Sequence, residues 1–127
     1  MRTMRISHKE IVQIYKENRD TLDKATESIV QLLDKRAEKI STGESCTGGL
    51  LSQLITSVSG ASGYFLGSVT SYANSVKTNV LGVPAEIIEK HGAVSSECVA
   101  AMAEGVRKLT GSDFSVATSG IAGPGGG

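Results

Sequence analysis

Residues 43–49 read Gly-Glu-Ser-Cys-Thr-Gly-Gly, and they stand between a short apolar run and the helical pattern Leu-Leu-Ser-Gln-Leu-Ile of residues 50–55. This order predicts a strand over residues 38–44 that passes through a glycine-rich turn into a helix over about 48–58. Free backbone N–H groups and the positive end of a helix dipole meet at such a junction, so it favours anions. A side chain held in the turn can attack a carbonyl carbon while the amides receive the oxyanion.

The chain before this turn is predicted to be helical. Residues 8–17 have the spacing of a short amphipathic helix, and a longer apolar stripe with a period near 3.6 follows it. We expect the side chains of this stripe to face the core. Its members are Leu22, Ala25, Ile29, Leu32, Leu33 and Ala37.

After the turn, strands are predicted over residues 67–73 and 113–118, with helices between them. Asn74 is a candidate N-cap for a helix over 75–81, Pro84 suits the first turn of the next helix, and Ser95 can cap a third helix that Gly111 ends. The apolar stripe of this third helix contains Cys98, Met102, Val106 and Leu109. Strands that alternate with helices predict an α/β domain with a largely parallel sheet.

The composition narrows the class of protein. The chain has 127 residues, of which 39% are hydrophobic and 20% charged, as expected for one globular domain. Thirteen basic and thirteen acidic residues give a net charge of zero, so there is no electrostatic footprint for nucleic acid. No apolar run is long enough for a bilayer, and the first ten residues do not resemble a signal peptide. Two cysteines, Cys46 and Cys98, make no disulfide framework, so we expect a cytoplasmic protein that binds neither membrane nor nucleic acid.

Three segments rich in glycine and hydroxyl groups each follow a predicted strand. They span residues 43–49, 71–77 and 118–127. Ligands of open α/β sheets bind beyond the carboxyl ends of the strands. We therefore expect the three segments to meet at one edge of the sheet and to form the functional site there.

Ser45 is the first candidate nucleophile, and it needs a base to remove its proton. The chain has two histidines, of which His91 stands at a predicted helix end, where a cationic or capping role is the more common one. Lys77 is the other candidate base, because a buried lysine loses its proton more easily and Ser–Lys pairs carry out acyl transfer. Tyr72, five residues earlier, is a candidate to orient that amine or to relay its proton. On spacing alone, however, a solvated helix lysine is the more common role for Lys77, and a half-packed strand residue the more common one for Tyr72.

Other features of the same segments leave alternatives open. Cys46 is intrinsically a better nucleophile than a serine, but a buried structural thiol is more common. Glu44 can bind a cation or hold a backbone amide. Residues 123–127, Gly-Pro-Gly-Gly-Gly, resemble a ligand-cradling loop only weakly and fit no phosphate-binding motif. No Cys/His cluster has the spacing of metal ligands, so neither a metal nor an organic cofactor is expected.

Taken together, the segments resemble one family, the C-terminal domain of the competence/damage-inducible protein CinA, which also occurs alone as nicotinamide-nucleotide amidohydrolase (PncC). The resemblance covers about residues 22–127, so we interpret residues 1–21 as an N-terminal helical extension. The matching blocks are Glu-Ser-Cys-Thr-Gly-Gly (44–49), Gly-Ala-Ser (60–62), Tyr-Phe-Leu-Gly (64–67), Ser-Tyr-Ala-Asn-Ser-Val-Lys (71–77), Leu-Gly-Val-Pro (81–84), His-Gly-Ala-Val-Ser (91–95) and Ser-Gly-Ile-Ala-Gly-Pro (119–124).

The resemblance implies a three-layer α/β/α fold with a mostly parallel or mixed sheet, and hydrolysis of the carboxamide of nicotinamide mononucleotide to nicotinic acid mononucleotide and ammonia. By motif position, Ser45 corresponds to the nucleophile, Lys77 to the general base and Tyr72 to a site tyrosine. The positions that would bind the substrate are Thr47, Gly48, Gly49, Ser119 and Gly120.

Members of this family normally continue with a Lys-Pro-Val-Gly-Thr segment, further strands, an arginine-bearing motif and a last helix. We therefore expect the C-terminal part of the family fold to be missing from this chain, and its activity to depend on that part. An exposed edge strand also favours a partner, so we expect a homo-oligomer. The alternative function is a non-catalytic module that binds nucleotides or other proteins.

Overall fold

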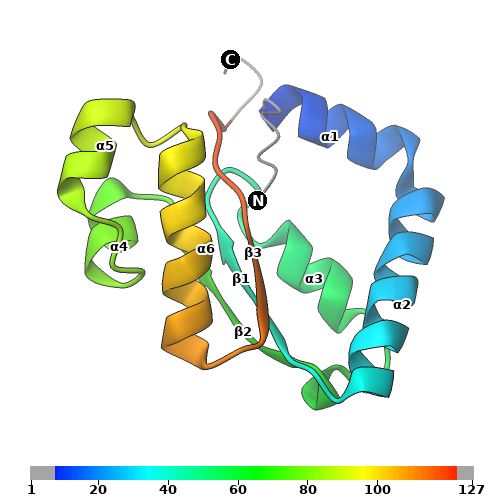
Figure 1. Ribbon diagram of the computed structural model, residues 1–127. Coiled ribbons are helices and arrows are strands. Elements are labelled where there is room, and N and C mark those ends of the chain that lie inside the picture. Colours follow the sequence, from blue (N-terminus) through cyan, green and yellow to red (C-terminus); the bar gives the residue numbers. More distant parts are fainter. Residues whose placement is uncertain (1–7, 123–127) are drawn as a thin grey trace.

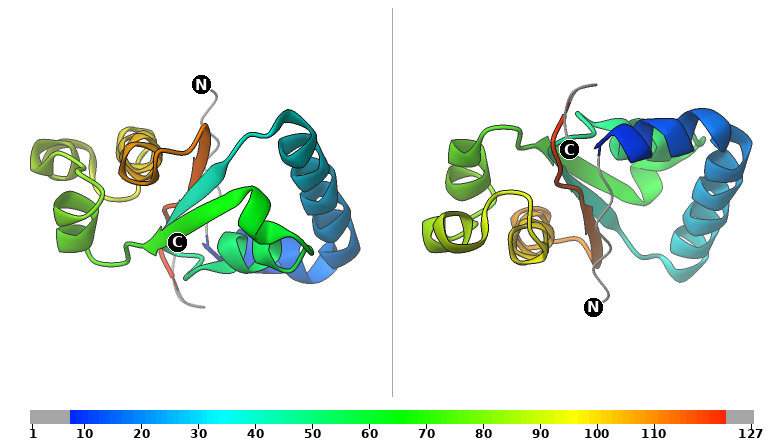
Figure 2. Two further views of the ribbon diagram at one scale, coloured as in Figure 1. Left: turned by 90° about the horizontal axis from the view of Figure 1, so that it is seen from below. Right: turned by 90° about the horizontal axis from the view of Figure 1, so that it is seen from above.

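A parallel three-stranded sheet lies between two layers of helices in the computed structural model, which describes residues 8–122 (Figure 1). The strands are β1 (Ile40–Glu44), β2 (Phe65–Thr70) and β3 (Phe114–Ala117), in the spatial order β2-β1-β3. One layer holds α1 (His8–Glu17), α2 (Arg19–Arg36) and α3 (Leu50–Thr56), and the other holds α4 (Asn74–Asn79), α5 (Ala85–His91) and α6 (Ser96–Thr110) (Figure 2). A 3-10 turn, η1 (Ala61–Gly63), precedes β2. The predicted three-layer α/β fold is confirmed.

The central strand β1 is buried along its whole length although its sequence is Ile-Ser-Thr-Gly-Glu. Alternate residues of a strand face opposite sides of the sheet. Ser41 faces α6, where its hydroxyl lies 3.5 Å from the Val106 carbonyl oxygen, and Glu44 faces α3, where it accepts a hydrogen bond from the Leu51 amide. The polar groups of β1 are thus hydrogen-bonded to both helical layers, as buried polar groups must be.

Two apolar clusters hold the layers to the sheet. On the α2–α3 side the cluster consists of Val30, Leu33, Ile40, Ile55 and Tyr64, and the Tyr64 hydroxyl donates to the carbonyl oxygens at the end of α3. On the α6 side it consists of Leu81, Val83, Cys98, Met102 and Val106. The α6 cluster lies under the carboxyl half of β1, next to Gly43, and so supports the turn that follows.

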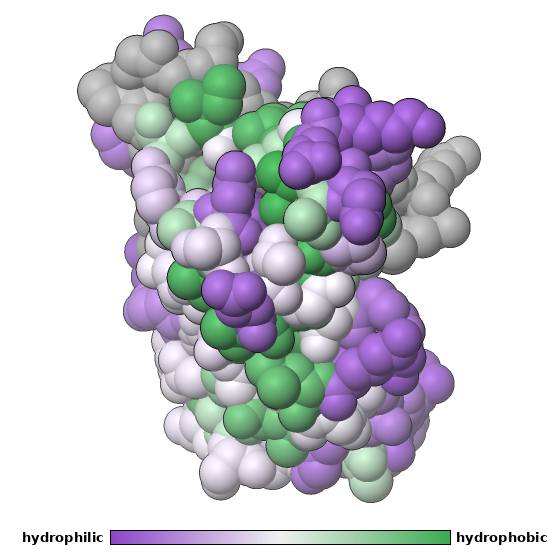
Figure 3. All heavy atoms as spheres, turned by 90° about the vertical axis from the view of Figure 1, so that its left-hand side faces the viewer, coloured by the Kyte–Doolittle hydropathy of each residue, from purple (hydrophilic) through white to green (hydrophobic). Residues whose placement is uncertain are grey.

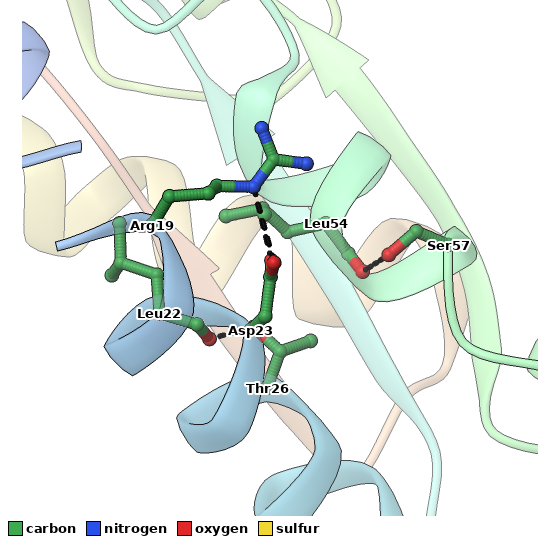
Figure 4. Close-up of polar contacts among 6 residues, drawn as sticks. All are labelled: Arg19, Leu22, Asp23, Thr26, Leu54 and Ser57. Carbon is green, nitrogen blue, oxygen red and sulfur yellow. Dashed lines mark hydrogen bonds and ion pairs between the residues drawn. The ribbon is translucent and has the colours of Figure 1, made fainter. Parts of the chain in front are cut away.

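The buried face of α2 differs from the predicted stripe. Val30 and Leu33 are buried, whereas Ile29 and Leu32 are 50% and 58% exposed. Nearer its start, α2 carries local polar contacts: Arg19 pairs with Asp23, and a threonine hydroxyl donates to the Leu22 carbonyl (Figure 4). Helix α2 is therefore oriented so that residues 26, 30 and 33 face the core. It also runs without a break across residues 21 and 22, where the family resemblance begins.

Helix α6 begins and ends as its sequence predicts. The Ser95 hydroxyl accepts a hydrogen bond from the Cys98 amide at 3.1 Å, and Gly111 ends the helix with φ at +74°. Leu109, in the last turn of α6, is 56% exposed although it lies on the same face as Cys98 and Met102. Asn74 is the first residue of α4 and Ala73 is the N-cap, so the predicted asparagine cap is wrong.

The remaining elements lie within a few residues of their predicted bounds. Strand β2 runs over 65–70 instead of 67–73, because its pairing partner β1 ends opposite Thr70. The face formed by α4, α5 and α6 carries apolar and hydrophilic side chains interspersed with one another (Figure 3). Among residues 8–122, no helix has both the length and the apolar character that a bilayer crossing requires.

Candidate active site

Ser45 and Lys77 lie in hydrogen-bond contact at the carboxyl edge of the sheet. Ser45 is the first residue after β1, and Lys77 lies in α4, which follows β2. The Lys77 Nζ is 3.2 Å from the Ser45 Oγ, and both side chains are buried. The two residues are 32 positions apart in the chain, so the sheet brings them together. The prediction that segments 43–49 and 71–77 meet is confirmed.

Two backbone carbonyls hold the Lys77 amine. Its Nζ donates to the Ser71 oxygen at 2.8 Å and to the Tyr72 oxygen at 2.9 Å. Burial lowers the pKa of Lys77, and the nearby thiols of Cys98 and Cys46 offset part of this effect. The interpretation of Lys77 as a solvated helix lysine is therefore wrong. An amine that is buried and has a lowered pKa is suited to accept a proton.

The end of β3 supplies a third contact to the turn. The Thr118 Oγ1 accepts a hydrogen bond from the Ser45 amide at 3.3 Å and lies 2.8 Å from the Thr47 Oγ1. The Thr118 amide in turn donates to the Gly43 carbonyl. Thr118 stands where the third segment begins, so the described part of that segment does reach the site. Its hydroxyl was not among the predicted site residues, although its place directly after a strand is the signal that finds it.

Glu44, the last residue of β1, is fully buried next to Ser45. Its carboxylate accepts hydrogen bonds from the amides of Leu51 and Ser52 and from the hydroxyls of Thr47 and Ser52. Burial by itself would raise the pKa of this carboxyl, but these hydrogen bonds outweigh burial and lower it. Of the two roles left open for Glu44, the structure shows the second, because it holds backbone amides.

The two glycines of the turn are required by the backbone. Gly48 and Gly49 have φ of +63° and +112°, a region that residues with a side chain rarely adopt. Gly49 is the N-cap of α3, so the helix begins two residues later than predicted. The Gly48 amide donates to the Ser45 carbonyl, which closes the turn beneath the nucleophile candidate.

Cys46 lies beside Ser45 but is built into the core. It is 4% exposed and forms no disulfide. Burial raises the pKa of its thiol, an effect that nearby amides and Lys77 reduce without reversing. A thiol with a raised pKa is a poor nucleophile near neutral pH. The geometry therefore favours Ser45 over Cys46.

Three further predicted residues lie near the site but contribute differently. Tyr72 reaches Lys77 through its carbonyl, while its side chain is 65% exposed, so the role expected for its phenol stays a prediction. Ser119 donates to the Ala93 carbonyl at 2.5 Å, which ties the segment after β3 to the loop between α5 and α6. Gly120 is half-buried beside it. His91 is the last residue of α5, and residues 123–127 lie outside the described part of the chain.

Fold and site together define an α/β protein that carries a buried Ser–Lys pair where its parallel strands end. The chain belongs to the CinA family, because the family model of the CinA C-terminal domain matches residues 22–127. It is 54% identical over 101 residues to a CinA-like protein of Pseudothermotoga lettingae, and 51% identical over 105 residues to one of Thermotoga maritima. These matches cover 80% and 83% of this chain but only 25% and 26% of the relatives. The chain thus spans about a quarter of their length.

Solved structures of the same family have the same fold. The competence damage-inducible protein A of Klebsiella pneumoniae aligns with a TM-score of 0.79 at 36% identity, over 84% of this chain and 66% of that one. The competence/damage inducible protein CihA of Agrobacterium tumefaciens aligns with a TM-score of 0.80 at 30% identity, over 99% and 68%. This chain therefore aligns with about two thirds of the length of each of these structures.

Proposed function

We propose that this chain carries the hydrolytic centre of a nicotinamide mononucleotide deamidase, which converts the nucleotide to nicotinic acid mononucleotide and ammonia. The observation that carries the proposal is the environment of the Lys77 amine. A neutral amine has two N–H donors and one lone pair. The carbonyls of Ser71 and Tyr72 can only accept, so they take both N–H groups. The third direction, toward the Ser45 hydroxyl, then holds the lone pair.

In the first half of the reaction the Ser45 Oγ attacks the carboxamide carbon while Lys77 accepts the serine proton. The tetrahedral intermediate carries an oxyanion, which we assign to backbone amides of the turn that follows Ser45. The C–N bond then breaks, and the nitrogen takes the proton from Lys77 and leaves as ammonia. An ester between the nicotinoyl group and Ser45 remains.

In the second half, water attacks the ester carbon and gives a proton to Lys77. The C–O bond to Ser45 breaks, and Lys77 returns the proton to the serine oxygen. The product is the carboxylic acid form of the nucleotide, and both side chains regain their initial state. Neither step requires a metal ion or an organic cofactor. Among residues 8–122, no three His, Cys, Asp or Glu side chains group as metal ligands would.

The test is ammonia release from nicotinamide mononucleotide by the full-length wild-type protein and by its variants Ser45→Ala and Lys77→Ala. We expect each substitution to lower kcat/KM by at least about 100-fold, as loss of a nucleophile or general base does. Activity that survives both substitutions would rule out the pair. Calorimetry with the same nucleotide tests the alternative function, a non-catalytic nucleotide-binding module. Binding without ammonia release would favour that alternative.

A further inference from the structure

The Glu44 carboxylate is the acceptor on which the hydrogen bonds of the turn converge. Six donors lie within hydrogen-bond distance of it, between 2.7 and 3.3 Å. Two are backbone amides and four are hydroxyls, and they come from β1, the turn, α3 and β2: Thr42, Thr47, Leu51 and Ser52 (amide and hydroxyl), and Ser68. A single buried carboxylate therefore joins three elements around Ser45.

Helix α3 lacks a capping side chain of its own, because its N-cap is Gly49. A helix leaves its first amides without partners, and a side chain at the N-cap usually accepts from the second or third of them. Here Glu44 takes this place from the preceding strand, with the amides of Leu51 and Ser52 at 2.7 and 3.1 Å. The strand-to-helix junction favours an anion, and the Glu44 carboxylate is that anion.

The carboxylate also sets the direction of the hydrogen bonds that reach Ser45. An ionised carboxylate can only accept, so Thr47 donates to it. Thr118 must then donate to Thr47, and its own oxygen is left to accept from the Ser45 amide. On the other side, the Glu44 carbonyl accepts from the Ser71 amide at 2.7 Å, in the segment whose carbonyls hold Lys77.

We propose that Glu44 is the positioning residue of the Ser45–Lys77 pair: its carboxylate fixes the turn to α3 and to Thr118, and so holds the Ser45 hydroxyl against the lysine amine. This inference rests on the proposed hydrolytic role of the pair. Glu44 is fully buried among protein donors, so we assign its carboxylate no contact with the substrate. It also implies that the start of α3 binds no substrate phosphate, since Glu44 already occupies its amides.

Labelling of Ser45 by a fluorophosphonate probe, which reacts with activated serines, tests this without reference to any substrate. Glu44→Gln keeps the shape of the side chain but replaces an acceptor by an N–H₂ donor that faces other donors. We expect labelling to slow by about 100-fold, the effect of misplacing a reacting group by about 1 Å. In ammonia release the loss should fall on kcat, with KM changed by less than about threefold, because no substrate contact is lost.

Tyr64→Phe is the matched control. It removes a buried hydroxyl that bonds the far end of the same helix, through the carbonyls of Ile55 and Val58. We expect its labelling rate to stay within about twofold of wild type even though it loses about 1 kcal/mol of stability. If Glu44→Gln does not fold, Ser52→Ala replaces it, since it removes one donor to the carboxylate and should slow labelling by about threefold.

Each outcome either supports or overturns the positioning role of Glu44. Slow labelling of Glu44→Gln or Ser52→Ala, with a normal rate for Tyr64→Phe, supports the positioning role. A wild-type rate in the variant tested, an equal loss in Tyr64→Phe, or a wild-type Ser45 that the probe does not label overturns it. Normal wild-type labelling without ammonia release would contradict the proposed function alone.

Discussion

At the scale of single residues, the site depends on placing a lysine where its charge is unfavourable. The Lys77 amine is buried, and its hydrogen-bond partners are two carbonyl oxygens and a hydroxyl, with no carboxylate among them. This arrangement satisfies the hydrogen bonds of the amine without stabilising its charge as a full ion pair would. With these partners, the Lys77 ammonium group should lose its proton more readily than a surface lysine does.

The pH dependence of kcat/KM should report this directly. Because only the neutral amine accepts the serine proton, activity should rise with pH through a single ionisation with a midpoint below the ordinary lysine pKa of 10.5. Lys77→Arg should be inactive at every pH, since a guanidinium keeps its proton. Lys108→Ala, which removes an exposed lysine, should leave the profile unchanged. A wild-type midpoint at or above 10.5 would contradict the role of Lys77.

The sequence indicates the Ser45–Lys77 pair but only part of what surrounds it. A hydroxyl and an amine that follow two strands of one parallel sheet make Ser45 and Lys77 candidates, and the family resemblance is what selects them. Thr118 and the carboxylate network of Glu44 depend on how β3 and α3 approach the turn, and no local pattern encodes that approach. Tyr72 is a second example of a contact that the sequence does not predict. It accepts from Lys77 through its backbone carbonyl and not through its phenol, and motif-based prediction considers side chains first.

At the scale of elements, the caps of α6 were more predictable than the buried face of α2. Ser95 and Gly111 bound α6 as expected, since capping depends on a few adjacent residues. The face of α2 was mistaken because Leu32 and Leu33 are both apolar, and only the packing against the sheet selects Leu33. Strand β2 was displaced for the same reason, since its end is set by its partner β1.

Helix α6 makes a close approach that only glycine permits, and this yields a prediction. A Cβ on Gly105 would lie 1.8 Å from the Leu81 carbonyl oxygen. In an exposed helix, glycine to alanine stabilises by about 1 kcal/mol. Here we expect Gly105→Ala to lower the free energy of unfolding by about 3 kcal/mol, because the whole helix must move. Leu109→Ala, at an exposed position in the last turn of the same helix, should change it by less than about 0.5 kcal/mol in the same denaturant titration. An unchanged stability for Gly105→Ala would be inconsistent with the packing of α6 described above.

At the scale of the whole molecule, apolar side chains remain exposed around the start of β3. Phe114 and Val116 are 43% and 42% exposed. The Arg36 guanidinium, at the end of α2, lies over the Phe114 ring, and the exposed Leu32 lies one helical turn before Arg36. We propose that this surface supports the expected homo-oligomer. Sedimentation of the wild-type chain should then show concentration-dependent association that Val116→Lys reduces and Leu109→Lys, on α6, does not. A wild-type chain that stays monomeric at the highest attainable concentration would rule this out.

The stability of the molecule in acid should depend on Glu44. Its folded-state pKa lies below the ordinary value of 4.5, so as the pH falls the unfolded chain takes up this proton first. The stabilisation that the carboxylate provides is therefore complete above about pH 4.5 and is lost as the pH drops through the folded-state pKa. Glu44→Gln cannot take up that proton, so its free energy of unfolding should fall less steeply in this range, and the gap to wild type should narrow. Urea titrations of both proteins between about pH 6 and pH 3 measure the two slopes, and the difference between them cancels the other carboxylates. Parallel curves over that range would mean that the network around Glu44 does not hold a carboxylate anion.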